Sequence, residues 1–256
     1  MKIIACIKQV PDSEAKVKAE GGQVSWGDAP LVINPFDEYA VEGALQQKEA
    51  NDGSTVTVIC VGPESAKEAL KHALAMGADE AILVTDPAVT NLDTLGAARI
   101  LAAAIKKAEG EMAVFGRQTL DNGAGLTPAQ TARLLGWPML GFAGQIKVEG
   151  GSVTVDRVIE EGRQTVQAKL PAVISVVQSI GEPRYPSFMG IRKASKAAIT
   201  SWSLNDLEVS APAAIVTRSD LMSPPVRETS VEIISGSSPD EIAGKLADKL
   251  IAEKVL

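Results

Sequence analysis

Apolar runs of strand length alternate with segments of helical character over the first half of the chain. The runs at 2–10, 55–62, 80–86 and 112–116 are continuously apolar or β-branched, as expected of strands buried on both faces. Between them, the segments 34–51, 65–77, 94–110 and 127–136 carry helical patterns with start and stop residues. In the first of these, Asn34 is expected to cap the helix and Pro35 to take its first position. This alternation is typical of βαβ units, so we predict an α/β fold with a mostly parallel, doubly wound sheet.

The pattern changes after Trp137 and Pro138. Residues 142–177 alternate with shorter periods and contain the turn pairs Gly150-Gly151 and Glu161-Gly162. We expect antiparallel hairpins added to the sheet there, with 166–177 returning to it as a strand. The next segment, 182–198, is polar and predicted to be irregular.

The sequence of residues 200–256 predicts an extended C-terminal arm that ends in a helix. Residues 200–230 are rich in Ser, Pro and Val and show no clear period. A helix over 238–254 should begin with Ser238 as cap and Pro239 in the first turn. Its apolar stripe must pack on this domain or on a partner chain; it consists of Ile242, Leu246, Leu250 and Ile251. We therefore divide the chain into an α/β nucleotide-binding domain, 1–199, and an arm, 200–256.

Charge and composition narrow the classes of function. A net charge of −7 argues against binding to nucleic acid or to anionic membranes, and no apolar run predicts membrane insertion. Cys6 and Cys60 lie in apolar runs, which favours buried free thiols in a reducing cytoplasm. The single histidine, His72, is expected on a helix surface, and one histidine leaves little material for a metal site or a catalytic triad.

A glycine-containing loop between the strand at 112–116 and the next helix is the main candidate site. In an open parallel sheet ligands bind at the carboxyl ends of the strands, where residues 5–9, 34–37, 60–62 and 116–127 should meet. Gly123 and Gly125 would let backbone N–H groups approach a phosphate, beside a helix N-terminus. Asp121 and Asn122 can accept hydrogen bonds from a ribose.

The hydroxyl groups of Thr127 and Thr131, one helical turn apart, could also donate hydrogen bonds to a phosphate. The alternative is a plain turn in which Thr127 caps the helix and Pro128 follows it. The loop carries neither a GxGxxG fingerprint nor a Walker lysine.

Two other groups of residues are candidates for a functional role. Glu160 and Glu161 stand together at a predicted hairpin turn, where adjacent acids usually form a solvated turn. Phe188 is followed by the basic residues Arg192, Lys193 and Lys196. An apolar side chain surrounded by charges can dock to another protein, but the same residues also suit an ordinary surface loop.

The run VDRVIEEGRQTVQAKLPAVIS, residues 155–175, resembles the signature of electron transfer flavoprotein β-subunits position by position. The matching elements are Val155, Arg157, the acidic pair and glycine at 160–162, Gln164, Val166, Pro171 and the apolar pair before Ser175. The blocks KQVPD, NPFDEYAVE, ALAMGAD and EPRYPSFMGIRKA are similar to family blocks in the same order. The resemblance covers residues 2–200.

This resemblance implies an adenine nucleotide alpha hydrolase-like fold and a heterodimer. The α-subunit would carry most of a redox FAD, and the β-subunit would hold a structural AMP and help to enclose that FAD. The final helix would be buried against the α-subunit. The AMP contacts carried over by position are Cys6, Asn34, Pro35, Phe36, Asp37, Val61, Gly116, Arg117, Gln118, Thr119, Leu120, Asp121, Asn122, Gly123, Ala124, Gly125, Leu126 and Thr127.

The resemblance also implies external partners. Electrons would come from flavin dehydrogenases of the acyl-CoA dehydrogenase type and pass to a quinone oxidoreductase or similar acceptor. Loop 184–196 would dock the dehydrogenase through Phe188, Met189, Arg192 and Lys193, with Phe188 in place of the usual leucine. Residues 11–13 and Phe36 would approach the FAD ring of the α-subunit. The chain would then be an electron-carrier subunit without catalytic residues of its own.

Two alternatives stay open. Some family members bind a second FAD in this place and perform electron bifurcation with NADH; their loop carries Asp-Thr-Ala-Gln-Val-Gly-Pro, whereas residues 123–129 here read Gly-Ala-Gly-Leu-Thr-Pro-Ala. The other is an ATP-binding domain of the universal-stress or PP-loop kind, whose glycine spacing differs from the one here.

Overall fold

The structure is a computed structural model, and it describes residues 1–20, 23–89, 92–217, 221–223, 225 and 231–255. The chain divides into two compact units, residues 1–221 and residues 222–256.

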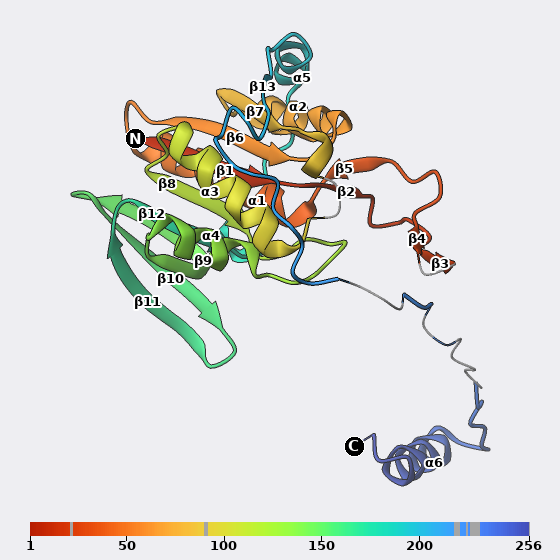
Figure 1. Cartoon of the computed structure of the whole chain (residues 1–256). Coiled ribbons are helices and arrows are strands. Elements are labelled where there is room, and N and C mark those ends of the chain that lie inside the picture. Colours follow the sequence, from red (N-terminus) through yellow and green to blue (C-terminus); the bar gives the residue numbers. More distant parts are fainter. Residues whose placement is uncertain (21–22, 90–91, 218–220, 224, 226–230, 256) are drawn as a thin grey trace. The chain divides into compact units, whose positions relative to one another are not determined.

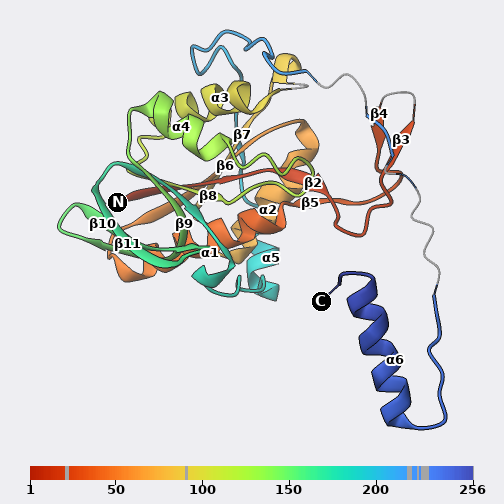
Figure 2. The same ribbon diagram turned by 90° about the horizontal axis from the view of Figure 1, so that it is seen from below.

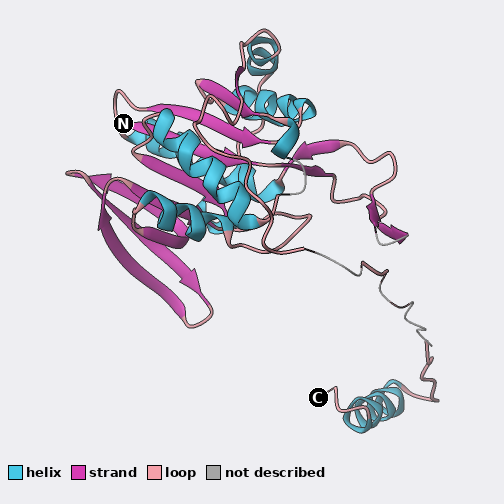
Figure 3. Cartoon of the chain, in the orientation of Figure 1, coloured by secondary structure: helices cyan, strands magenta, loops and turns pink. Residues whose placement is uncertain are grey.

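A nine-stranded sheet forms the centre of the first unit, in the order β11-β10-β9-β12-β8-β1-β6-β7-β13 (Figures 1 and 3). Its strands are β1 (Lys2–Ile7), β6 (Thr55–Val61), β7 (Glu80–Val84), β8 (Met112–Gly116), β9 (Met139–Glu149), β10 (Ser152–Ile159), β11 (Gly162–Lys169), β12 (Ala172–Val176) and β13 (Thr200–Trp202). All neighbouring pairs are parallel except those that β10 makes with β9 and β11. The predicted sheet and its added hairpins are confirmed.

Helices cover both faces of this sheet (Figure 2). The apolar residues of α1 (Pro35–Ala50) and α2 (Lys67–Met76) join one buried cluster, and those of α3 (Thr94–Lys107) and α4 (Thr127–Leu135) join another. Strands buried between two such layers must be apolar on both sides, which explains the continuous apolar runs in the sequence.

The strand order reverses beside β1. The chain runs from β1 to β6 and then β7 on one side, and returns to place β8 on the other side of β1. The carboxyl ends of β1 and β8 therefore flank a topological switch point, where open α/β sheets form their ligand crevices.

Short elements extend from the end of β1. A two-stranded ribbon pairs β2 (Gln9–Pro11) with β5 (Leu31–Ile33), and a second pairs β3 (Lys18–Glu20) with β4 (Gln23–Ser25). Single 3₁₀ turns occur at η1 (Glu64–Ala66), η2 (Pro87–Val89) and η3 (Gln178–Ile180).

Four segments differ from the sequence-based expectation. The run 2–10 is divided between β1 and β2, and the expected strand at 166–177 is divided between β11 and β12. Thr200–Trp202 forms β13 and pairs with the edge strand β7, although these residues were assigned to the arm. This strand was not predicted because three residues are too few to show the alternation of apolar and polar positions that indicates a strand. The expected irregular segment contains a short helix, α5 (Phe188–Ala194), because the Ser187 hydroxyl accepts a hydrogen bond from the Gly190 amide and caps it.

The second unit contains α6 (Pro239–Ala252), whose predicted cap is confirmed: the Ser238 side chain accepts a hydrogen bond from the Glu241 amide. No residue of α6 is buried, and Leu246 and Ile251 of its apolar stripe are 46% and 62% exposed. Of the helices that the structure describes, none has the length and apolar character needed to cross a membrane.

Candidate functional site

A cleft of about 990 Å³ opens at the carboxyl ends of β1, β6 and β8. Cys6, Val61 and Gly116 mark the strand ends in its wall. The loop between β8 and α4, the beginning of α3 and the segment around Val216 complete the lining. The segments that were expected to meet at this sheet edge are thus brought together at the switch point.

Gly116 and Asp37 fix the contact between β8 and the beginning of α1. A Cβ atom on Gly116 would overlap the Asp37 carboxylate and the Phe36 carbonyl, so only glycine fits. The Asp37 carboxylate is buried and accepts a hydrogen bond from the Lys8 amide at 2.8 Å. Burial raises the pKa of Asp37 to about 7, against the lowering effect of hydrogen bonds from Asn34, Lys8 and Gly116.

Asn34 holds the loop in place from α1. Its side chain is fully buried; its Nδ2 donates to the Gln118 carbonyl at 2.9 Å, and its Oδ1 accepts from the Leu120 amide at 3.1 Å. Asn34 stands at the N-cap position of α1 but makes no side-chain capping bond there. The predicted capping role is therefore wrong, because the loop uses both polar atoms of the amide.

The loop runs into a helix whose first turn has no side-chain cap. Gly123 and Gly125 adopt φ values of 66° and 62°, a region that favours glycine. Leu126 occupies the N-cap position of α4, and Thr127 is the first helical residue. The alternative in which Thr127 caps the helix is wrong. The first-turn N–H groups lack a capping side chain, and such groups can donate to water or to a bound anion.

Lys8 and Asp121 form an ion pair in the cleft wall. The Lys8 Nζ lies 2.5 Å from Asp121 Oδ2, and both residues line the cleft. The other carboxylate oxygen, Oδ1, is buried and has no hydrogen-bond partner among the residues described. Lys8 was not predicted from the sequence as a site residue. Its position directly after a buried strand was the signal that could have identified it.

Some of the predicted contact residues line the cleft and others do not. Thr131 is fully buried and does not line the cleft, so only Thr127 of the threonine pair faces it. The predicted residues that line the cleft are Cys6, Asp37, Val61, Gly116, Gln118, Thr119, Asp121, Asn122, Ala124, Gly125, Leu126 and Thr127. Asn34, Pro35, Phe36, Arg117, Leu120 and Gly123 are not among its lining residues.

The cleft also has an apolar part, of which only Leu126 was expected from the sequence. It is lined by Val89, Leu92, Leu101, Leu126 and Val216. Leu126 and Val216 are 53% and 71% exposed, so apolar surface is available to a flat ring.

The two thiols are not reactive groups. Cys6, in the cleft wall, and Cys60 are both free and buried. Burial raises the pKa of the Cys6 thiol well above its ordinary value and that of Cys60 to about 12. A protonated thiol is a weak nucleophile. Within the described part of the chain, no cluster of His, Cys, Asp and Glu has the makeup of a metal site.

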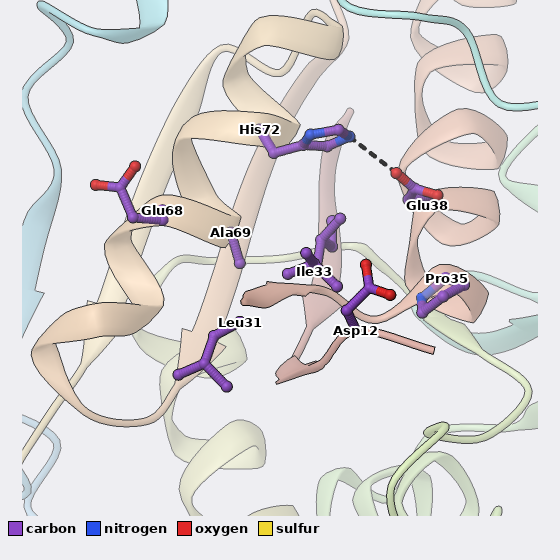
Figure 4. Close-up of a pocket in the computed structure, with 9 residues that line it drawn as sticks. Asp12, Leu31, Ile33, Pro35, Glu38, Glu68, Ala69 and His72 are labelled. Carbon is purple, nitrogen blue, oxygen red and sulfur yellow. Dashed lines mark ion pairs between the residues drawn. The ribbon is translucent and has the colours of Figure 1, made fainter. Parts of the chain in front are cut away.

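A second, smaller cavity of about 370 Å³ lies between the β2–β5 ribbon and helices α1 and α2 (Figure 4). His72 on α2 pairs with Glu38 on α1, with 2.9 Å between Nε2 and Oε1. The imidazole is partly exposed, as predicted for a helix-surface residue. This pair joins two helices and lies apart from the lining of the larger cleft.

The short helix α5 presents an exposed apolar surface. Phe188, Met189 and Ile191 are 80%, 68% and 54% exposed, and Arg192 and Lys193 beside them are exposed too. A Cβ atom on Gly190 would lie 2.5 Å from the Ala75 carbonyl oxygen, so α5 packs closely on α2.

Arg184 fixes the segment that leads into α5. Its guanidinium contacts Glu42 Oε2 at 2.8 Å and Glu49 Oε1 at 2.5 Å, both on α1. Burial alone would raise the pKa of Glu42, but the hydrogen bonds and charge of Arg184 outweigh this and lower it. The pair is therefore ionised at neutral pH and holds the segment against α1.

Comparison with known proteins gives consistent matches. The family model described as "Electron transfer flavoprotein domain" matches residues 26–207. The chain is 35% identical to the caffeyl-CoA reductase-Etf complex subunit CarD of Acetobacterium woodii, over 100% of both chains. It is 32% identical to the electron transfer flavoprotein subunit beta of Megasphaera elsdenii, also over 100% of both. The Mycobacterium tuberculosis subunit beta is 41% identical over 81% of this chain and 80% of its own length.

Proposed function

Because this chain belongs to the electron transfer flavoprotein family as a β-subunit, we propose that it holds AMP in the cleft as a structural ligand and helps an α-subunit to enclose a redox FAD. The heterodimer would take electrons from flavin dehydrogenases of the acyl-CoA dehydrogenase type and pass them to a quinone oxidoreductase or similar acceptor. The FAD, when bound, supplies the electron chemistry; this chain supplies position and surface.

The uncapped beginning of α4 carries the AMP proposal. A phosphate there would accept hydrogen bonds from first-turn N–H groups, and Gly125 lets the backbone come close. Lys8 lies in the same wall, where its charge is paired with that of Asp121. The residues fit the phosphate end of a nucleotide.

The ribose and base have candidate partners as well. Asp121 Oδ1 is a buried acceptor that lacks a partner among the described residues, and a ribose hydroxyl would satisfy it. The apolar part of the cleft suits adenine.

A scaffolding role follows from the chemistry of the lining. Asp37 is committed to holding the Lys8 and Gly116 amides, and the Cys6 thiol is held protonated. A protonated thiol is a weak nucleophile, and the hydrogen bonds that Asp37 accepts hold the end of β8 and the residue after β1 against α1. The side chains around the phosphate end serve to bind and orient it.

A second FAD in the same cleft is the other candidate. The cleft volume of about 990 Å³ is at the upper end of the roughly 300–1,000 Å³ range of ligand pockets, which leaves room for a dinucleotide. The chain would then be the FAD-binding subunit of a bifurcating, NADH-oxidising flavoprotein.

Identification of the bound nucleotide separates the two candidates. The chain is co-expressed with its α-subunit, the complex is denatured, and the released nucleotides are quantified by chromatography. One AMP and one FAD per heterodimer is the expected result. Two FAD and no AMP would replace the first candidate by the second.

We further propose that α5 is the docking surface for the dehydrogenase. Phe188 would enter an apolar pocket of the partner, and Met189, Arg192 and Lys193 would surround the contact. The exposure of Phe188, 80%, supports this role, since exposed large apolar side chains at a charged rim are typical of interface anchors.

A further inference from the structure

One wall of the cleft comes from a segment far along the chain. Ala214, Val216 and Thr217 line the same cleft as the glycine loop 116–127. Figures 1 and 2 show the segment after β13 running beside α3. We call residues 212–217 the strap. It lies within the first unit, residues 1–221, together with the rest of the cleft.

A single carboxylate attaches the strap to α3. Asp93 Oδ1 accepts a hydrogen bond from the Gly96 amide at 2.7 Å and so caps α3. Asp93 Oδ2 accepts from the amides of Ile215 at 2.7 Å and Val216 at 3.2 Å. The two oxygens therefore have separate tasks, one within α3 and one toward the strap.

The side chains of the strap contribute little packing. Ile215 and Val216 are 69% and 71% exposed, although Val216 lines the cleft. Pro212 is the packed end of the strap, since its Cγ would lie 3.4 Å from a Cβ atom on Gly96. With so little buried apolar surface, the hydrogen bonds to Asp93 decide where residues 215 and 216 lie.

The three amide hydrogen bonds, from Gly96, Ile215 and Val216 in that order, hold the pKa of the Asp93 carboxyl below its usual range. Asp93 is therefore ionised at neutral pH. A charged acceptor gives stronger hydrogen bonds to the strap amides than a neutral oxygen would.

We infer that Asp93 is a positioning residue for the nucleotide: its second carboxylate oxygen holds the strap as a wall of the cleft, so that bound nucleotide and strap stabilise each other. The inference rests on the proposed function, because it takes the cleft to hold a nucleotide. Mutual stabilisation follows by thermodynamic linkage, since a ligand that contacts the placed strap favours its placement.

The test separates the two tasks of Asp93. Asp93→Ser keeps a hydroxyl oxygen for the Gly96 amide, because serine is as good an N-cap as aspartate, but it removes the oxygen that holds the strap. In the heterodimer loaded with AMP, we expect AMP to dissociate about tenfold faster than from the wild type, because only part of the free energy of the two lost hydrogen bonds to a charged group is coupled to AMP binding. Displacement by excess unlabelled AMP measures this rate.

Hydrogen exchange gives a readout that a loss of folding would not mimic. In Asp93→Ser the amides of Ile215 and Val216 should exchange faster, while the Gly96 amide keeps its wild-type rate. In the wild type, added AMP should slow exchange at Ile215 and Val216. A second variant, Ile215→Pro, removes one donor from the strap and leaves the α3 cap intact; it should also release AMP faster.

The outcomes distinguish the inference from the proposed function. A wild-type complex that neither retains nor binds AMP removes the proposed function itself. A wild-type complex that holds AMP, beside an Asp93→Ser complex with the same AMP dissociation rate, overturns the inference. So does faster exchange at Ile215 and Val216 in the variant without any change in AMP dissociation.

Discussion

The cleft proposed to hold a nucleotide and the helix proposed to dock a dehydrogenase, α5, are built on opposite physical plans. In the cleft, the groups that set the shape are buried and already bonded: Asn34 is fully buried and Asp37 is 5% exposed. At α5, the side chain proposed as the anchor, Phe188, is 80% exposed, and Arg184, in the segment that leads into the helix, ties that segment to α1. A site for a permanently held ligand can use fixed backbone, whereas a surface for changing partners must leave its apolar anchor open.

The difference also determines how each region should fail. Changes in the cleft should lower stability and ligand retention together, since the same buried contacts serve both. Changes at α5 should lower the rate of partner reaction and leave stability and cofactor content unchanged. The following four predictions test this contrast, beginning with the largest effect.

Gly116→Ala should be the most damaging substitution. The new Cβ would overlap the Asp37 carboxylate and the Phe36 carbonyl, which cannot move without displacing α1. We expect the free energy of unfolding to fall by about 3 kcal/mol, as for overpacking of a core. Urea denaturation measures this. Gly62→Ala is the matched control, because its Cβ would meet only Ala66 at an ordinary 3.4 Å; an equal loss there would contradict the prediction.

Gly125→Val should weaken nucleotide retention with less effect on the fold. A β-branched residue at φ 62° costs about 2 kcal/mol and pushes the loop backbone away from a phosphate. AMP content after gel filtration of the heterodimer measures retention. Gly136→Val, at φ 71° beyond the far end of α4, introduces similar strain away from the cleft. Retention that is equal in the two variants would exclude the loop as the phosphate cradle.

Phe188→Ala should slow electron transfer from the dehydrogenase about tenfold, the loss expected for an interface anchor. The thermal unfolding temperature and FAD content should stay at wild-type values because the side chain is exposed. Stopped-flow reduction by a dehydrogenase measures the rate. Loss of FAD would instead make Phe188 a folding residue, contrary to the docking proposal.

Arg184→Lys should give the smallest effect, about a threefold loss in the same reaction. Lysine retains the charge opposite Glu42 but loses the forked contact that reaches Glu42 and Glu49 together, so α5 is placed less firmly. The exposed Arg192 offers a comparison: Arg192→Lys keeps the surface charge and should change the rate less. The reverse ranking would show that contact at the surface matters more than the tether.

Much of the fold was accessible from the sequence because it depends on local periodicity. The strand at 112–116 and the helices at 34–51 and 94–110 were predicted nearly as they are found, since burial on both faces leaves a continuous apolar run. Short elements were not accessible. Three residues of β13 and seven of α5 are too few to show a period.

The candidate site was predicted as a set of segments, but the roles of its side chains were not. Asn34 was expected to cap α1 and instead holds the Gln118 carbonyl and the Leu120 amide. Lys8 was overlooked because its partner, Asp121, lies 113 residues away. Both residues depend on β8 lying next to β1, which the periodicity of either strand does not reveal.

By itself, the sequence determined the α/β class, the run of strands and helices, and the glycine loop that enters α4, because these are set by nearest neighbours and by the conformational freedom of glycine. Only the tertiary structure decided which polar groups face one another. The hydrogen bond from Ile215 to Asp93 joins residues 122 positions apart, and the one from Asn34 to Gln118 spans 84. Such pairs form once the strand order has brought distant segments to one sheet edge, and burial then makes an unpaired polar group costly.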